Sequence, residues 1–199
     1  MRFVAVLNEG GGTLRTTDLD TFSARLVEIL EGAGHRVSVE IVPGKLIEDA
    51  LKEAAARRGV DVVLAGGGDG TVSAAAGALM GSRKTLAILP AGTMNLFARS
   101  LGIPLKLEEA VAAFAGGKSR AVDISTADGR PFVHQFSIGL HAKMVGLREG
   151  MEFGSKIGKI GASVRAAYGT ILNPPSMKVQ LRLGETEMLV RSSGIGGTN

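Results

Sequence analysis

The 199-residue chain has a net charge of +4, and 45% of its residues are hydrophobic, which is enough to bury a core in one or two domains. It has no cysteine, which excludes disulfides and thiolate metal sites, and no apolar run approaches the roughly 20 residues of a membrane span. The charge favours anionic partners, but with 4% aromatic residues and no basic–aromatic interleaving no nucleic-acid partner is predicted.

The first predicted element is a strand over residues 2–8, apolar almost throughout, as in a parallel sheet that is covered on both faces. A glycine-rich turn over residues 9–13 follows it. A helix is then predicted from a capping box at residues 17–20 to Gly34, because apolar residues recur at helical spacing. Its stripe consists of Leu19, Phe22, Leu26 and Ile29.

A strand with one wetter face is predicted over residues 36–41, where apolar and polar residues alternate. Pro43 ends it, and residues 45–58 are predicted to form a second amphipathic helix. The apolar stripe of that helix is predicted to contain Leu46, Ala50 and Ala54.

A buried strand is predicted over residues 61–65, and it stops in three glycines, Gly66, Gly67 and Gly68. The sequence Asp69-Gly70-Thr71 then leads into an alanine-rich helix. Glycines let successive backbone N–H groups converge without Cβ clashes, and a helix N-terminus adds positive partial charge and free donors. This loop therefore predicts a phosphate site, to which Thr71 can add a hydroxyl group.

Asp69 is unusual in such a loop, because a carboxylate beside phosphate is repelled unless it binds a cation or accepts a proton. A phosphotransferase needs such a group. A glycine-rich structural turn with a surface Asp is an equally good interpretation of the loop alone. The loop lacks the Gly-Lys-Ser/Thr of a Walker A motif, and Thr71 stands where a dinucleotide-binding motif has its last glycine.

A second strand–loop–helix unit follows, with a strand at residues 85–89, a loop at 90–95 that contains Gly92, Thr93 and Asn95, and a helix at 96–101. The alternation of strands and helices predicts a parallel sheet with right-handed crossovers. Because parallel strands end at one edge of their sheet, both Gly-Thr loops are expected there. The predicted fold class is α/β, with a doubly wound parallel-sheet nucleotide-binding domain.

Residues 108–116 predict another helix, and the glycine-rich segment 116–119 is the predicted domain boundary. The expected division is a nucleotide-binding domain at residues 1–119 and a β-rich domain at residues 120–199. In the second domain, strands are predicted at 120–125 and 131–138 around an Asp-Gly turn. A helix at 155–172 and a hairpin at 177–192 follow.

The pair Gly-Gly-Asp-Gly-Thr at residues 67–71 and Pro-x-Gly-Thr-x-Asn at 90–95 resembles the diacylglycerol kinase catalytic domain family, which includes bacterial lipid kinases and sphingosine and ceramide kinases. The resemblance runs from residue 4 to the end, and the segment at 137–140 resembles the start of the family's second domain. It implies a first domain like those of phosphofructokinase and NAD kinase, and part of an antiparallel β-sandwich. Family members continue further, so the chain is expected to be a fragment or a shortened member.

The resemblance implies transfer of the γ-phosphoryl group of ATP, with Mg²⁺, to a lipid hydroxyl such as that of diacylglycerol. Asp69 would be the catalytic residue, orienting or deprotonating the acceptor hydroxyl or holding Mg²⁺ through water, and no metal ligand is assigned. Asn8 matches the asparagine of the family's Asn-Pro-x-x-Gly nucleotide loop, although Glu9 replaces the proline. The implied nucleotide contacts are Asn8, Thr13, Gly66, Gly67, Gly68, Gly70, Thr71, Gly92, Thr93 and Asn95.

A diacylglycerol-like lipid substrate implies a cytoplasmic protein that visits the anionic inner membrane face transiently, as part of phospholipid biosynthesis. The predicted membrane contact is a basic stretch with Lys143, Arg148, Lys156 and Lys159. Two alternatives remain. An NAD kinase-like phosphotransferase shares the first motif, although the Pro-x-Gly-Thr-x-Asn-x-Phe-Ala-Arg run favours the lipid kinases. A non-catalytic nucleotide- or lipid-binding regulator would keep the loops without the chemistry.

Overall fold

The structure is a computed structural model that describes residues 1–140 and 176–198. The chain divides into two compact units, Met1–His134 and Gln135–Thr198, called here the α/β unit and the β unit. The predicted boundary between residues 119 and 120 stays a prediction. The predicted helix at 155–172 and the basic stretch that contains Lys143 lie outside the described residues.

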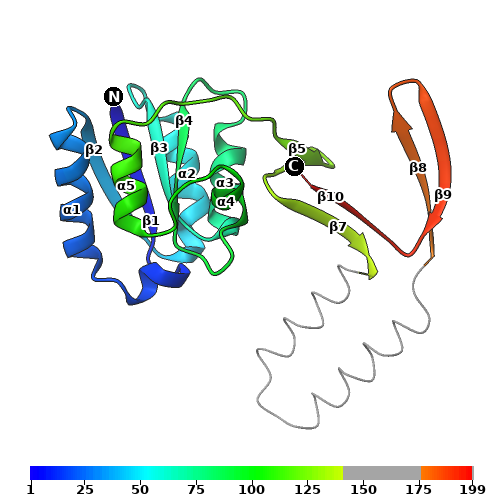
Figure 1. The fold of residues 1–199 in the computed structure, drawn as a ribbon, viewed down its shortest axis with the longest axis horizontal. Helices are drawn as coiled ribbons and strands as arrows, with labels where there is room; N and C mark the ends of the chain where they lie inside the picture. Colours follow the sequence, from blue (N-terminus) through cyan, green and yellow to red (C-terminus); the bar gives the residue numbers. More distant parts are fainter. Residues whose placement is uncertain (141–175, 199) are drawn as a thin grey trace, which may run out of the picture. The chain divides into compact units, whose positions relative to one another are not determined.

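The α/β unit is built on four parallel strands in the order β2-β1-β3-β4. They are β1 (Arg2–Asn8), β2 (Arg36–Val42), β3 (Val62–Gly67) and β4 (Thr85–Pro90), and Figure 1 shows them side by side. The chain runs from β1 to β2 on one side of β1 and then crosses to β3 on the other side of β1. The predicted doubly wound parallel sheet is therefore confirmed.

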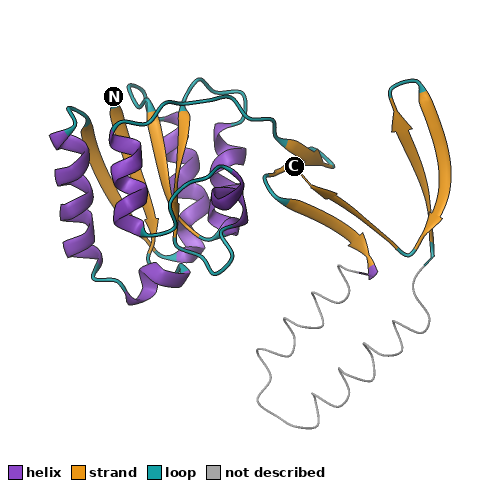
Figure 2. Cartoon of the chain, in the orientation of Figure 1, coloured by secondary structure: helices purple, strands orange, loops and turns teal. Residues whose placement is uncertain are grey.

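Helices cover both faces of this sheet (Figure 2). One face carries α1 (Leu19–Gly32) and α5 (Leu107–Ala115), and the other carries α2 (Ile47–Ala56) and α3 (Asp69–Leu79). The short helix α4 (Leu96–Ser100) follows the loop after β4. The connecting loops therefore lie at the two ends of the strands, outside the layers formed by the sheet and the helices.

The packing on both faces of the central strand β1 explains why its sequence is apolar throughout. Phe3, Ala5 and Leu7 point into the core under α1 and α5, whereas Val4 and Val6 point into the core under α2 and α3. All five side chains are buried. A strand that is covered on both faces needs apolar residues at every position, because neither face meets water.

The predicted apolar stripe of the second helix is confirmed at Ala50 and Ala54 but wrong at Leu46. Leu46 is 47% exposed, whereas Ile47 and Leu51 are 7% and 1% exposed and form the buried stripe together with Ala54. A 3₁₀ turn, η2 (Gly44–Leu46), precedes α2 and rotates the start of the helix, so that Leu46 points to solvent. Helix α1 follows its predicted pattern more closely, and its N-cap is Asp18, whose carboxylate accepts the N–H of Thr21.

Lys84 holds the C-terminal end of α2. Its ammonium group donates to the carbonyl of Ala55, and to those of Arg57 and Ala54 at 2.6 and 3.4 Å. The last carbonyls of a helix have no partner within the helix and carry negative partial charge. A cation there therefore satisfies three carbonyl groups at once.

Lys84→Met is expected to lower the free energy of unfolding by about 1–3 kcal/mol, because charge-assisted hydrogen bonds are lost at nearly constant side-chain length. Denaturant unfolding measures the change. Arg83→Met is the matched control: Arg83 is exposed and has no ion pair in the described part of the chain, so its replacement should change stability by less than about 0.5 kcal/mol. Equal effects of the two replacements would contradict this role of Lys84.

The predicted Asp-Gly turn is confirmed. It joins β5 (Ser125–Ala127) to β6 (Arg130–Phe132), and Asp128 and Gly129 have φ angles of 51° and 72°. Positive φ angles at both central residues are typical of a type I′ hairpin. Val133, which follows β6, is buried against the α3 side of the unit, so the hairpin belongs to the α/β unit.

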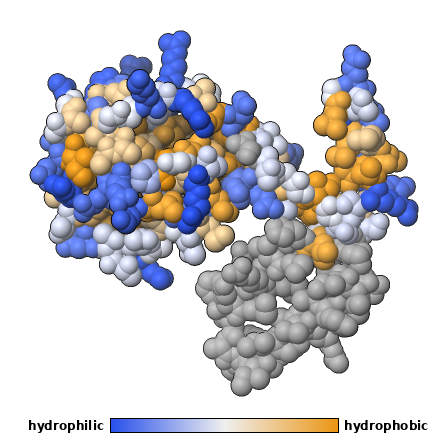
Figure 3. All heavy atoms as spheres, in the orientation of Figure 1, coloured by the Kyte–Doolittle hydropathy of each residue, from blue (hydrophilic) through white to orange (hydrophobic). Residues whose placement is uncertain are grey.

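The β unit contains two antiparallel pairs in its described part. β7 (Gln135–Gly139) pairs with β10 (Gly194–Thr198), and β8 (Met177–Leu183) pairs with β9 (Thr186–Ser192). The predicted strand at 131–138 is thus divided between β6 and β7, and β10 lies in a glycine-rich segment in which no strand was predicted. Figure 3 shows the apolar surface that β8 and β9 expose. The exposed side chains include Leu181, Leu183, Met188, Leu189 and Val190.

Candidate functional site

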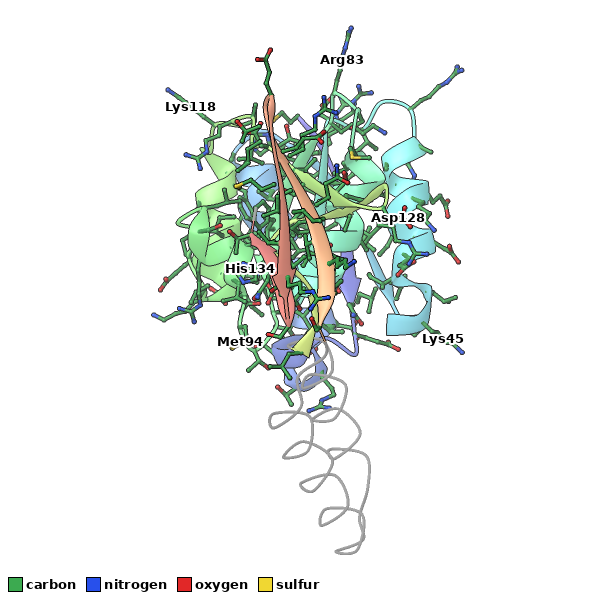
Figure 4. All side chains as sticks on the ribbon, turned by 90° about the vertical axis from the view of Figure 1, so that its right-hand side faces the viewer. Lys45, Arg83, Met94, Lys118, Asp128 and His134 are labelled. Carbon is green, nitrogen blue, oxygen red and sulfur yellow. The ribbon has the colours of Figure 1, made fainter. Side chains whose placement is uncertain are left out.

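The predicted site residues all lie at the edge of the parallel sheet where its strands end, called here the carboxyl edge. The strand order reverses between β1 and β3, and such a switch point leaves a crevice at the carboxyl ends of the two strands. The three loops that follow β1, β3 and β4 meet there. In Figure 4, Met94 of the third loop and Lys45 lie at this end of the α/β unit, and Arg83 and Lys118 lie at the other.

Asn8 connects the first two loops across the switch point. Its side-chain N–H donates to the hydroxyl oxygen of Thr71 at 3.3 Å, and its side-chain carbonyl accepts the N–H of Gly10 at 3.0 Å. Thr71 is only 7% exposed. The amide of Asn8 is therefore used to hold the loop after β1 against the first turn of α3.

Three glycines of the second loop, Gly66, Gly67 and Gly68, allow close packing, whereas a Cβ at Gly70 would meet nothing within 4 Å. A Cβ at Gly66 would lie 2.6 Å from the Leu7 side chain, and one at Gly67 would collide with Thr71. A Cβ at Gly68 would lie 3.3 Å from the Cα of Gly92. None of these glycines has a positive φ angle. They are needed because neighbouring chain segments approach them, and not because of a left-handed backbone.

The N-terminus of α3 presents free backbone donors. Within the described residues, the N–H groups of Asp69, Gly70 and Thr71 have no hydrogen-bond acceptor, and no side chain caps the helix. Helix α3 has 11 residues, so its aligned peptide dipoles place positive partial charge at these donors. This is the part of the edge that suits a phosphate group.

The Asp69 side chain turns away from its own helix toward the next one. Its Oδ1 accepts the N–H of Leu96 at 2.8 Å and that of Phe97 at 3.4 Å. These are the first two residues of α4. The carboxylate thus occupies the N-terminus of α4, whereas the N-terminus of α3 stays free. Neither this link nor the part played by Leu96 was anticipated from the sequence.

Main-chain contacts interlock the third loop with the other two. Ala91 donates its N–H to the carbonyl of Gly67 at 2.9 Å and accepts the N–H of Thr13 at 2.7 Å. A Cβ at Gly92 would lie 2.5 Å from the Cα of Gly68. Gly12 has a φ angle of +33°, and a Cβ there would collide with the carbonyl of Ala91. Gly12 and Ala91 were not among the predicted site residues, although the glycine run at residues 10–12 was a signal for the first of them.

Asn95 shapes the third loop from within. It has a left-handed backbone with φ of 50°, is 9% exposed, and both accepts the N–H and donates to the carbonyl of Gly92, each at 2.8 Å. Both polar groups of its side chain are therefore used inside the loop. Thr93 is exposed, and it lies between Gly92 and the 57%-exposed Met94.

A polar loop cluster of this kind can bind an anion, but the described residues contain no group of three His, Cys, Asp or Glu side chains that could hold a metal ion. Also in the described part, no helix is long and apolar enough to cross a lipid bilayer.

Comparison with known proteins identifies the family. The diacylglycerol kinase catalytic domain model matches residues 2–127, which is more than half of the chain and includes all three loops. The chain belongs to the diacylglycerol kinase catalytic domain family. The resemblance predicted from the two Gly-Thr loops is thus confirmed.

Two curated relatives match the chain in sequence, and one crystal structure shares its fold. The chain is 34% identical to the diacylglycerol kinase of Bacillus subtilis (strain 168) over 126 residues, which are 60% of this chain and 41% of that one. It is 45% identical over 82 residues to a protein of Enterobacter sp. (strain 638) named "Probable lipid kinase YegS-like", covering 39% of this chain and 27% of that one. A diacylglycerol kinase structure from Bacillus anthracis str. Sterne shares the fold, with a TM-score of 0.71 and 24% identity over 100% of this chain and 65% of that one. The chain thus spans less than half the length of these curated relatives.

Proposed function

We propose that this chain contains the nucleotide-binding domain of a lipid kinase that transfers the γ-phosphoryl group of ATP to a lipid hydroxyl, with diacylglycerol as the substrate class. The observation that carries the proposal is the free N-terminus of α3 beside Asp69, at the switch point of a sheet in this family. The names of the curated relatives support the lipid class. Phosphoryl transfer depends mainly on positioning and charge stabilisation, which such a loop cluster supplies.

In this proposal the free N–H groups of residues 69–71 bind phosphate oxygens, and the hydroxyl of Thr93 adds a donor from the third loop. Gly66, Gly67, Gly68 and Gly92 allow the loops to pack closely, and Gly70, where a Cβ would meet nothing within 4 Å, leaves open space beside its N–H group for the phosphate. Asn8 and Thr13 hold the first loop against the other two, through Thr71 and Ala91. Asp69 orients the acceptor hydroxyl or accepts its proton.

The donor set fits Mg²⁺ that binds together with the nucleotide. Mg²⁺ in phosphoryl-transfer sites is bound by one or two carboxylates plus phosphate oxygens and water, and Asp69 supplies a carboxylate beside the free N–H groups of α3. When bound, the metal would neutralise charge on the transferring phosphoryl group. The lipid would be bound by the β-rich region at residues 120–199, and the protein would act in the cytoplasm at the anionic inner membrane face.

The test is an ATP titration together with a lipid-phosphorylation panel. The 199-residue chain is expected to bind ATP, seen as a thermal shift, and to phosphorylate lipids poorly, because the chain spans only part of its relatives. The complete gene product is expected to phosphorylate a diacylglycerol-like lipid. A thermal shift with NAD and none with ATP would favour the NAD kinase-like alternative. ATP binding without lipid phosphorylation by the complete gene product would favour a non-catalytic regulator.

Thr93→Ala is expected to weaken ATP binding by about 10- to 150-fold, because one hydrogen bond to a charged group contributes about 1.5–3 kcal/mol. Isothermal titration calorimetry measures the change. Thr126→Ala is the matched control, since Thr126 is also exposed but lies on β5, outside the three loops. Unchanged affinity in Thr93→Ala would remove Thr93 from the proposed phosphate contacts.

A further inference from the structure

Helix α4 depends on Asp69 for its first turn. The N-cap of α4 is Asn95, whose side chain does not cap the helix because it is bonded to Gly92 instead. The carboxylate of Asp69 takes that place and accepts the N–H groups of Leu96 and Phe97. A helix of five residues has little stability of its own, so an external acceptor at its start matters more than in a long helix.

The same contact fixes one end of the third loop. At its beginning, the loop is tied to β3 by the bond from the N–H of Ala91 to the carbonyl of Gly67. At its end, it is tied to α3 by Asp69. Thr93 lies between these two anchors, and the bonds between Asn95 and Gly92 stiffen the segment that carries it. Without the bonds to Asp69, the end of the third loop that follows Thr93 would be held only by its connection to α4.

We propose that Asp69 is a positioning residue for the third loop, in addition to its proposed part in phosphoryl transfer. Its Oδ1 fixes α4, and through α4 it sets the distance between Thr93 and the free N–H groups of α3. One carboxyl group thereby has two tasks: its Oδ1 organises the nucleotide site, and its negative charge serves the reaction. The effect on nucleotide affinity rests on the proposed function, but the effect on the loop does not.

Two replacements separate these tasks. Asp69→Asn keeps an oxygen acceptor at the position of Oδ1 and removes the charge. Asp69→Ala removes both. If the residue positions α4, Asn should preserve the loop and Ala should release it. Asp61 provides the matched control, because its carboxylate also accepts a backbone N–H from another element, that of Arg2 at 2.7 Å, but at the opposite edge of the sheet.

The first measurement is amide hydrogen exchange by NMR in the 199-residue chain without any ligand. In Asp69→Ala, the amides of Leu96 and Phe97 are expected to exchange at least about tenfold faster than in the wild type, because their acceptor is lost. In Asp69→Asn and Asp61→Ala, their rates should stay within about threefold. Unchanged protection of both amides in Asp69→Ala would overturn the proposal. If Asp69→Ala fails to fold, Asp69→Leu, which keeps the side-chain shape without an acceptor, takes its place.

The second measurement is ATP affinity by calorimetry. Asp69→Ala is expected to bind ATP about tenfold or more weakly than Asp69→Asn, which lacks the same charge but keeps the acceptor, while Asp61→Ala binds like the wild type within about threefold. Equal losses in Asp69→Asn and Asp69→Ala would show that charge, and not positioning, controls affinity, and would overturn the proposal. If the wild-type chain does not bind ATP, the proposed function fails, and the exchange rates of Leu96 and Phe97 still decide the positioning role.

Discussion

Asp69→Asn is expected to lower lipid-kinase turnover by about 10²- to 10⁴-fold in the complete gene product, the usual loss when a general base is removed. The replacement keeps the size of the side chain and the acceptor for Leu96, so the third loop should stay in place. Nucleotide affinity should persist or rise, because one negative charge has left the phosphate site. Steady-state kinetics with saturating ATP separate the two effects, since the loss should fall on kcat.

Asp61→Asn is the control for this experiment. Asp61 accepts the backbone N–H of Arg2, which holds the pKa of its carboxyl group below the ordinary value, and it lies at the edge opposite the loops. Its replacement should leave turnover within about twofold, since it touches none of the three loops. If Asp69→Asn keeps near-normal turnover, the carboxylate only positions α4, and the group that accepts the proton lies elsewhere in the protein.

Gly92→Ala is expected to weaken nucleotide binding by at least about tenfold and to lower the free energy of unfolding by about 1–3 kcal/mol, the usual cost of overpacking. The new Cβ would lie 2.5 Å from the Cα of Gly68 and 3.0 Å from the side-chain oxygen of Asn95. The first of these neighbours is backbone, which cannot rotate away as a side chain can. The second and third loops must therefore separate, and the phosphate donors of α3 lose their register with Thr93.

Gly32→Ala provides the comparison. Gly32 is the last residue of α1, and a Cβ there meets nothing within 4 Å. Alanine is favoured over glycine in a helix by up to about 1 kcal/mol, so stability should stay equal or increase, and ATP affinity should not change. Calorimetry and denaturant unfolding of both variants test the pair. Normal ATP affinity in Gly92→Ala would show that the contact between Gly68 and Gly92 does not shape the nucleotide site.

The carboxyl edge could be located from the sequence because two simple rules agree there. Apolar runs that end in glycine predict buried parallel strands, and parallel strands end at one edge of their sheet. The positions of Asn8, Asp69 and Thr93 on three neighbouring loops follow from these rules alone. The family membership followed from the spacing of the two Gly-Thr loops, and the matched residues 2–127 confirm it.

Pairings between distant residues could not be predicted in the same way. Asp69 lies 27 residues before Leu96, and nothing in either segment shows that the carboxylate crosses to the next helix instead of staying at α3. The strand β10 is similar: its sequence is rich in glycine, which disfavours strands, and pairing with β7 determines its conformation. Leu46 points to solvent because η2 turns the chain before α2 begins, which the apolar pattern does not encode.

The strand–loop–helix order, the doubly wound sheet and the edge at which the glycine loops gather could be predicted from the sequence, because these depend on local apolar periodicity and on glycine at strand ends. Which backbone donors at that edge are free could be seen only in the folded structure. The N–H groups of residues 69–71 at the start of α3 are unoccupied within the described residues, whereas those of Gly92, Leu96 and Phe97 are already bonded to Asn95 and Asp69. The reason is physical: a hydrogen bond between segments far apart in the chain depends on how the core packs them together, and no single segment carries that information.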